Sequence, residues 1–379
     1  MQRATEQKLR RLRILSRRLD RMIENGSFYA LPFWQRFALV RRVKRLYSSL
    51  LGPLSPGVAR AIVAGAATLA IAACVPAGEN FRPLRQANSP SFVAPVKDPF
   101  GFVPIAAGKP VAPAFADIDG NGTADLFAGA GGEGAGVIAY FKNTGSQTVP
   151  SFAAGAPYPG LPDDSTVFAD RNPAPVLAPL HGGSVFDALV GSGVGGAPYL
   201  QYFQNSGSTF SPTALPAGLP SNGDYELDAT AVDINGDGLL DVLVSSTSYD
   251  SNTAAFVNTI DYYKNTGTAT APAFTDQATS LGIDLPAGSF GYPTFVDING
   301  DGLYDAFVGN DNGDIYYFKN IGTATAPKFA APVKNPFGIT AVPAGPAVPA
   351  FVDIDHDGDF DLFVGDGNGD LWFYKNTNF

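Results

Sequence analysis

The chain has 379 residues, enough for one large domain or two ordinary ones, and 45% of them are hydrophobic, which suffices for a buried core. The net charge of −10 is unevenly divided. Residues 1–74 hold fourteen Lys and Arg against three acidic residues, and the rest of the chain holds eleven against thirty-two. This acidic part would repel phosphates, so the composition argues against nucleic-acid binding and favours binding of cations.

The first predicted element is a basic amphipathic helical extension over residues 1–57, because apolar side chains recur at helical spacing beside arginines between residues 9 and 22. A signal-like apolar segment follows over residues 58–74. Its uncharged stretch, residues 61–73, is too short to span a bilayer as a helix and is typical of an export signal. Residues 75–87 are expected to be a linker. The alternative is a solvated helical hairpin that remains in the mature protein.

Cys74 is the only cysteine, which excludes an internal disulfide and a cysteine-based metal site. The tetrapeptide Ile71–Cys74 resembles a bacterial lipobox, in which the cysteine is acylated and becomes the mature N-terminus. This resemblance implies lipidation of Cys74. We therefore expect an exported protein that is either secreted or held at the cell surface or outer membrane. Contact with a membrane would come only from the signal segment or the lipid anchor.

Residues 88–379 contain a motif that recurs five times. Each copy holds four short β-prone runs divided by turns of Gly, Asn, Asp and Pro, with no helical periodicity. Four strands in a unit of this length are typical of a propeller blade. The copies are anchored at Asp117, Pro179, Asp233, Asp297 and Asp353.

The two ends of the repeat region indicate how the blades close. The last copy stops after its third strand, and the missing fourth run is found at the start, where Pro90–Gly101 matches Pro327–Gly338. A strand borrowed from the N-terminus closes a ring without leaving an open edge. The sequence therefore predicts an all-β, five-bladed β-propeller of four-stranded blades. An open solenoid and a β-sandwich are the alternatives, since neither requires the shared strand.

Four copies carry an acidic loop between their first and second strands. Oxygens at loop positions 1, 3 and 5 converge on a hard cation, Gly at position 6 permits the tight turn, a carbonyl at position 7 adds a ligand, and Asp at position 9 closes the cage. The side-chain ligands are Asp117, Asp119, Asn121 and Asp125; Asp233, Asn235, Asp237 and Asp241; Asp297, Asn299, Asp301 and Asp305; and Asp353, Asp355, Asp357 and Asp361.

All-oxygen, anionic ligation selects Ca²⁺, with Mg²⁺ and Mn²⁺ as lesser alternatives. Asp, Asn and Gly also form turns without any metal, but four matching loops in step favour about four calcium sites. We expect this calcium to be chiefly structural. The second copy, aligned on Asp187, has Pro179, His181 and Gly183 at the ligand positions and is expected to bind none.

These loops, together with the Lys-Asn pairs that follow them, resemble the FG-GAP/VCBS repeat family, which includes the integrin α-subunit propeller and many bacterial surface proteins. The resemblance covers about residues 88–379. It implies calcium at the positions named above, with backbone carbonyls from Thr123, Leu239, Leu303 and Asp359. It also implies an adhesion or interaction module whose partner is a protein or a glycan.

Two further patterns have simpler explanations. Gly191–Gly196 contains GxGxxG, but a strand-like run follows in place of the helix that a phosphate site needs. His181, Ser184 and Asp187 can be drawn as a triad, yet they are near neighbours on one turn and no element for an oxyanion is identifiable. We therefore expect no enzyme and no catalytic or organic-cofactor residues. The alternatives are a surface-assembly component or, with less support, a propeller enzyme acting on extracellular polysaccharide.

Residues 245–258 form an insert that widens the third copy. It is interpreted either as a ligand-contact loop or as solvated decoration, and the second interpretation is favoured.

Overall fold

The computed structural model describes residues 90–377 except 106–107, 132–135, 163–171, 184, 193–199, 222–226, 251–254, 279–280 and 286–289. The chain divides into two compact units, and the described residues all belong to the second, Ser89–Asn378. The predicted basic extension, the signal-like segment with Cys74 and the whole linker lie outside the described residues. Within the described part, no helix has the length and apolar character needed to cross a membrane.

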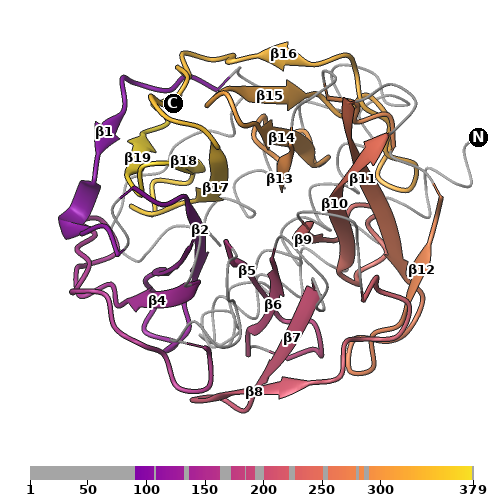
Figure 1. Ribbon diagram of the computed structural model, residues 1–379, viewed down its shortest axis with the longest axis horizontal. Helices are drawn as coiled ribbons and strands as arrows, with labels where there is room; N and C mark the ends of the chain where they lie inside the picture. Colours follow the sequence, from indigo (N-terminus) through magenta and orange to yellow (C-terminus); the bar gives the residue numbers. More distant parts are fainter. Residues whose placement is uncertain are drawn as a thin grey trace, which may run out of the picture. The chain divides into compact units, whose positions relative to one another are not determined.

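The second unit is a β-propeller of five antiparallel sheets arranged around a central axis (Figure 1). The first blade comprises β2 (Val111–Ala116), β3 (Asp125–Ala130) and β4 (Val137–Phe141), and the second β5 (Ala174–Ala178), β6 (Asp187–Gly191), β7 (Leu200–Asn205) and β8 (Phe210–Thr213). The third comprises β9 (Leu227–Val232), β10 (Asp241–Asp250), β11 (Ala255–Asn265) and β12 (Phe274–Asp276). The fourth comprises β13 (Tyr292–Val296), β14 (Asp305–Gly309), β15 (Ile315–Phe318) and β16 (Val333–Lys334).

The fifth blade is built from both ends of the unit, as the sequence predicts. Its strands are β17 (Val348–Val352), β18 (Asp361–Gly365), β19 (Leu371–Tyr374) and, on the outside, β1 (Val96–Lys97). In Figure 1, β1 and the C-terminal strands lie in the same blade although they come from opposite ends of the colour bar. The fold is therefore the closed five-bladed propeller, and neither an open solenoid nor a sandwich.

The N-terminal segment that completes the fifth blade has the same backbone features as the matching segment of the fourth blade. Val96 pairs with Phe373 as Val333 pairs with Tyr317. The short 3₁₀ turn η1 (Pro99–Gly101) follows β1, and Phe100 within it has φ 58°, against 61° for Phe337 at the matching place. The same local sequence, Pro-Phe-Gly, thus sets the same local backbone at two sites far apart in the chain.

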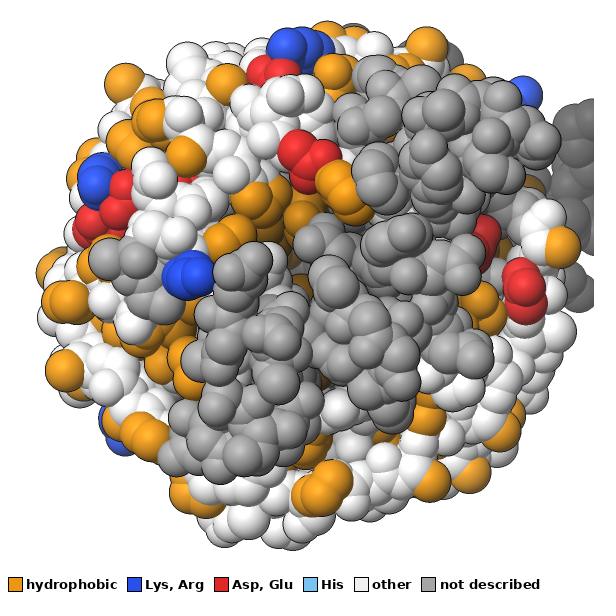
Figure 2. Space-filling view, in the orientation of Figure 1, with side chains coloured by type: hydrophobic (Ala, Val, Ile, Leu, Met, Phe, Trp, Pro, Cys, Tyr) orange, Lys and Arg blue, Asp and Glu red, His pale blue; other side chains and the backbone are white. Residues whose placement is uncertain are grey.

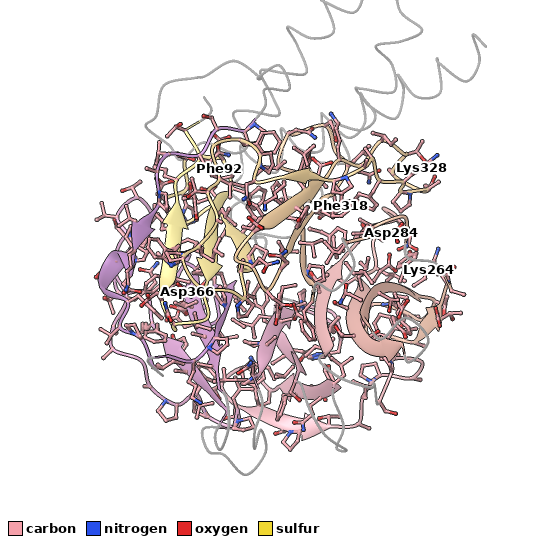
Figure 3. The ribbon with its side chains drawn as sticks, turned by 45° about the horizontal axis from the view of Figure 1, so that its top comes forward. Phe92, Lys264, Asp284, Phe318, Lys328 and Asp366 are labelled. Carbon is pink, nitrogen blue, oxygen red and sulfur yellow. The ribbon has the colours of Figure 1, made fainter. Side chains whose placement is uncertain are left out.

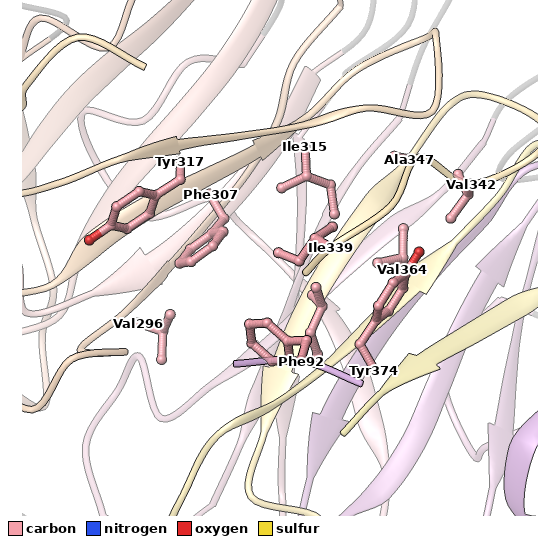
Figure 4. Packing of buried hydrophobic residues seen from close by; sticks show 11 residues of the cluster. Phe92, Val296, Phe307, Ile315, Tyr317, Ile339, Val342, Ala347, Val364 and Tyr374 are labelled. Carbon is pink, nitrogen blue, oxygen red and sulfur yellow. The ribbon is translucent and has the colours of Figure 1, made fainter. Parts of the chain in front are cut away.

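Each seam between neighbouring blades contains one cluster of buried hydrophobic side chains. Figure 4 shows the seam of the fourth and fifth blades, where Phe92 from the N-terminal segment packs with Val296 and Phe307 on one side and Val364 and Tyr374 on the other. Burial of such large apolar side chains drives folding. Apolar contacts between their facing sheets therefore hold neighbouring blades together. The N-terminal segment contributes Phe92 to this core and β1 to the sheet of the fifth blade.

Glycine at the end of the second strand lets neighbouring blades approach. A β-carbon on Gly365 would lie 2.0 Å from the carbonyl oxygen of Val111, and one on Gly309 would lie 1.9 Å from that of Ala347. Val111 opens the innermost strand of the next blade around the ring. The repeated Gly is thus required by close backbone contact at the seam.

Two blades depart from the simplest prediction. The fourth run of the first blade is reduced to isolated bridges, Tyr140–Ala156 and Asn143–Phe152, so its ladder has three strands. The insert in the third blade is largely regular: β10 and β11 continue as a paired hairpin up to Asp250 and Ala255. The described part of the insert therefore lengthens a sheet.

Candidate functional site: the loops between first and second strands

The acidic loops join the innermost strand of a blade to its second strand, and position 9 is the first residue of that second strand. Asp125, Asp187, Asp241, Asp305 and Asp361 occupy this place in the five blades, and each is fully buried. Residues that are distant in sequence are thus brought to five equivalent places around the ring.

At every position 9, the Asp fastens the end of the third strand. Its Oδ1 accepts a hydrogen bond from the backbone N–H of the Asn in the Lys-Asn pair, or in Gln-Asn in the second blade. These distances are 2.7 Å for Asn143, 3.0 Å for Asn205, 2.8 Å for Asn265, 2.8 Å for Asn320 and 2.8 Å for Asn376. One carboxylate oxygen is therefore committed to the fold in all five blades.

The side chain of this Asn also forms hydrogen bonds, one of them to the backbone next to position 9. Asn265 Nδ2 donates to the carbonyl of Leu240, just before Asp241, at 3.1 Å, and its Oδ1 accepts from Gly267 N–H at 3.1 Å. Equivalent bonds occur around Asn143, Asn205 and Asn320. The sequence analysis did not identify this Asn as part of the site. Its retention in the second copy, where the other loop ligands are lost, was the signal available.

A tyrosine hydroxyl satisfies the second oxygen of position 9 in three of the acidic blades. Tyr140, Tyr262 and Tyr317 donate to Oδ2 of Asp125, Asp241 and Asp305 at 3.1, 3.0 and 2.9 Å. In the fifth blade Phe373 stands at the corresponding place. The buried Oδ2 of Asp361 accordingly has no hydrogen-bond partner among the described residues.

Position 1 ties the loop across its turn. Oδ2 of Asp117, Asp233, Asp297 and Asp353 accepts from the N–H of the position-6 glycine at 2.9 to 3.2 Å. These glycines have φ of 90° or 96°, as the predicted tight turn requires. The other oxygen, Oδ1, is buried without a hydrogen-bond partner among the described residues in Asp117 and Asp353. Buried polar atoms of this kind ordinarily have a partner.

Positions 3 and 5 also serve the turn. Asn235 Oδ1 accepts from Asp237 N–H at 3.0 Å, and Asp237 Oδ1 accepts from Leu239 N–H at 3.0 Å. The same short-range bond joins the position-5 side chain to the N–H of Thr123, Leu303 and Asp359. The predicted position-7 residues are thus held in the loop by their N–H groups.

The fifth loop brings its acidic side chains closest together. One carboxylate oxygen from each of Asp353, Asp355 and Asp357 lies within 4.8 Å of the others, the one such group of three among the described residues. Burial raises the pKa of Asp353 to about 7 and that of Asp361 to about 8, with further contributions from the neighbouring Asp355 and Asp357 charges. Burial is the largest cause of both shifts, and the neighbouring charges add to it.

The same effect is weaker in the other three acidic blades. Burial raises the pKa of Asp125, Asp241 and Asp305 to about 6. In these loops the neutral Asn121, Asn235 or Asn299 replaces one acidic ligand, and the tyrosine hydroxyl lowers the pKa of the position-9 Asp. The donor set, all oxygen and mostly anionic, fits a hard divalent cation in each case.

The second blade replaces the acidic loop with a histidine. His181 Nδ1 forms a short hydrogen bond with Asp187 Oδ2, and the backbone N–H of His181 bonds the same oxygen at 3.2 Å. Asp187 keeps its bond to Asn205, so this blade retains the fold-stabilising half of the motif and lacks the acidic half. Ser184, the third member of the triad considered above, lies outside the described residues.

Comparison with known proteins identifies the repeat. Residues 297–364, which contain the whole of the fourth and fifth acidic loops, match the FG-GAP-like repeat. The search of curated proteins gave no match.

Two solved structures match over much of the chain. A lectin from Agrocybe aegerita, described as recognising non-reducing terminal N-acetylglucosamine, is 17% identical with a TM-score of 0.36, covering 71% of this chain and 80% of the lectin. The Dos1 propeller is 14% identical with a TM-score of 0.27, covering 70% of this chain and 66% of that one.

Proposed function

We propose that the chain, in which residues 297–364 match the FG-GAP-like repeat and five blades close a ring, binds calcium at four loops. We propose further that it presents a calcium-stiffened propeller to a protein or glycan partner. The proposed ligands are the Asp and Asn residues at positions 1, 3, 5 and 9 of the first, third, fourth and fifth blades, with the position-7 carbonyls. We propose a non-enzymatic role outside the cell, either secreted or anchored through Cys74.

The fifth loop is the observation that carries the calcium proposal. Three carboxylates share one small volume there, and buried oxygens of Asp353, Asp355 and Asp361 have no hydrogen-bond partner among the described residues. Such oxygens lose their hydration without compensation, which is costly unless a cation provides it. Calcium accepts six to eight oxygen ligands with flexible geometry, so it suits a loop that supplies both side chains and carbonyls.

A structural role for the ion follows from where its ligands lie. Position 9 starts the second strand and is bonded to the end of the third, while positions 1 to 5 follow the first strand. A cation held by all of them would join three strands of one blade. An ion that binds only the folded chain stabilises it by mass action.

The direct test is a calcium titration of the full chain by calorimetry. We expect about four ions per chain, by the count of acidic loops. Replacing Asp353 with Ala should remove one ion from this stoichiometry. Replacing Asp284 with Ala provides a control that removes a carboxylate outside the loops and should leave the stoichiometry unchanged. A wild-type chain that takes up no calcium would refute the proposal.

The interaction role is supported by the distribution of charge and by the rigid frame. On the face shown in Figure 2, the described Lys and Arg side chains are scattered and gather in no basic patch, which disfavours a nucleic-acid partner. Loops on a rigid propeller are well placed for binding. Glycan arrays and pull-down experiments with and without calcium test this role. Calcium-dependent self-association would instead favour the assembly component, and sugar released from polysaccharide would favour an enzyme.

A further inference from the structure

A lysine lies within one residue of the end of the third strand in every blade that carries an acidic loop. It directly precedes the Asn that bonds position 9. The second blade, which has no acidic loop, has Gln204 at this place. Among the five copies, lysine therefore occurs together with the loop acids. The four lysines are Lys142, Lys264, Lys319 and Lys375.

Three of these lysines reach the oxygens at positions 3 and 5. Lys142 Nζ lies 2.7 Å from Asp119 Oδ2, and Lys264 Nζ, at the periphery of the third blade (Figure 3), lies 3.4 Å from Asp237 Oδ2. Lys375 Nζ contacts Asp355 Oδ2 and lies 3.3 Å from Asp357 Oδ2. The lysine ammonium therefore occupies the side of the loop where the proposed cation ligands lie.

The most acidic loop makes the most contacts with its lysine. The fifth loop has Asp at both positions 3 and 5, and Lys375 bonds both. The first and third loops have one acid at these positions, and each lysine bonds that acid alone. The fourth loop has the same residue types at positions 3 and 5 as the third, Asn299 and Asp301, but the described contacts include no ion pair between Lys319 and Asp301.

Lys375 is the lysine with the most carboxylate contacts. Its Nζ contacts both Asp355 and Asp357, and its side chain is only 34% exposed, so the ammonium is partly shielded from solvent. An ammonium held this way offsets part of the repulsion among the loop carboxylates. A divalent cation that binds the same oxygens must displace it.

We infer that the three lysines that contact their loops are tethered counter-ions that compete with the divalent cation, with Lys375 the strongest competitor. The inference rests on the calcium binding proposed above and describes how that binding is regulated. The lysine stabilises a loop that holds no calcium and weakens its affinity for calcium. The chain then folds at low calcium and gains stability as calcium rises.

The test replaces Lys375 with Met, which preserves the aliphatic length and removes the charge. We expect calcium to bind the affected loop roughly threefold to tenfold more tightly, the range for removing one partly buried ammonium from beside a cation. In chelator the melting temperature of K375M should fall below that of the wild type, and saturating calcium should close the gap. Lys375→Arg, which retains a charge, should behave much more like the wild type.

Two further variants make the result specific. Lys142→Met removes the charge from a more exposed ion pair and should also tighten calcium binding. It replaces K375M as the test variant if K375M folds poorly. Lys334→Met removes an equal charge from its pair with Asp314 outside the acidic loops and should leave the titration unchanged.

The outcomes separate this inference from the proposed function. If the wild type binds calcium but K375M binds it equally or more weakly, the lysine does not compete and the inference is wrong. If K375M loses the same amount of melting temperature with and without calcium, Lys375 has a purely structural role. That result would also contradict the inference. A wild type without calcium uptake refutes the proposed function and removes the basis of the inference.

Discussion

The second and fifth blades have the same strand order but opposite loop chemistry. Both place a fully buried Asp at the start of the second strand, and both bond it to the backbone of an Asn at the end of the third. In the second blade the other oxygen of Asp187 meets His181, a neutral or cationic partner from the same chain. In the fifth, the other oxygen of Asp361 has no hydrogen-bond partner among the described residues, and the charges of Asp355 and Asp357 act on it.

This difference separates two roles that one motif combines. The Asp–Asn bond persists where every other loop ligand is lost, so it belongs to the fold. The convergent acids of positions 1, 3 and 5 add nothing to the Asp–Asn bond and concentrate like charges. They therefore require a compensating cation, and the second blade shows that a blade forms without them.

The largest expected effect is the loss of stability when divalent cations are removed. At a free calcium concentration about a hundred times its dissociation constant, each loop adds about 2.7 kcal/mol to the free energy of unfolding. Four such loops should raise the melting temperature by on the order of 10 °C or more. Calorimetric melting in calcium and in chelator measures this effect. Equal melting temperatures would show that the acidic loop of the fifth blade gains no more from calcium than the second blade does.

A smaller effect is expected from removing the shared Asp in each blade. Asp187→Ala leaves the buried N–H of Asn205 without its acceptor, at a cost of about 1 to 3 kcal/mol. Because no calcium is expected in this blade, the loss should be the same with and without calcium. Asp361→Ala should cost more in calcium than in chelator, since in chelator it also relieves repulsion from Asp355 and Asp357.

Denaturant unfolding of both variants in both conditions provides the measurement. A calcium-dependent loss for Asp187→Ala would show that the second blade binds the ion after all. A calcium-independent loss for Asp361→Ala would limit the fifth loop to its role in the fold.

The sequence was sufficient to predict the five-bladed architecture, because five repeats and a last blade divided between the two chain ends leave few ways to arrange the strands other than a closed ring. It was insufficient for the dual role of position 9. The pattern identifies Asp361 as a ligand, but its bond to Asn376, fifteen residues later, depends on how the second and third strands align. Likewise, the polar composition of the 245–258 insert suggests a loop, whereas cross-strand pairing extends the sheet through it.

The stability of the calcium-free chain should depend on pH through the fifth loop. Burial first, and then the neighbouring charges, raise the pKa of Asp353 to about 7 and of Asp361 to about 8, above the ordinary value of 3.8. A carboxyl whose pKa is raised in the folded state stabilises that state below the unfolded pKa, and this contribution is lost as pH rises through the folded value. In chelator, the melting temperature should therefore fall between about pH 5 and pH 8.

Melting scans across this range, with and without calcium, give the comparison. Calcium should flatten the decline, because the bound ion compensates the ionised carboxylates. Asp361→Asn should reduce the decline in chelator, whereas a control variant, Asp276→Asn, lies outside the loops and should retain it. A chelated wild type that becomes more stable as pH rises would contradict the assignment of uncompensated charge to this loop.

The smallest expected effect concerns position 4 of the fifth loop. His356 has φ 55°, where the first, third and fourth loops have Gly120, Gly236 and Gly300 with φ of 70° to 72°. A non-glycine residue in this left-handed region costs roughly 1 kcal/mol. His356 Nδ1 offsets part of that cost through a 3.1 Å hydrogen bond with the carbonyl of Gln147, in the first blade. The contact therefore spans the seam where the ring closes.

His356→Ala keeps the strained backbone and loses the seam contact, so it should be the least stable variant at this position. His356→Gly loses the contact but removes the strain, and should exceed the Ala variant by roughly 1 kcal/mol. Denaturant unfolding in saturating calcium measures the difference. An Ala variant as stable as the Gly variant would show that the fifth loop adopts another backbone at position 4, and the fifth blade would then differ from the other acidic blades in shape as well as in charge.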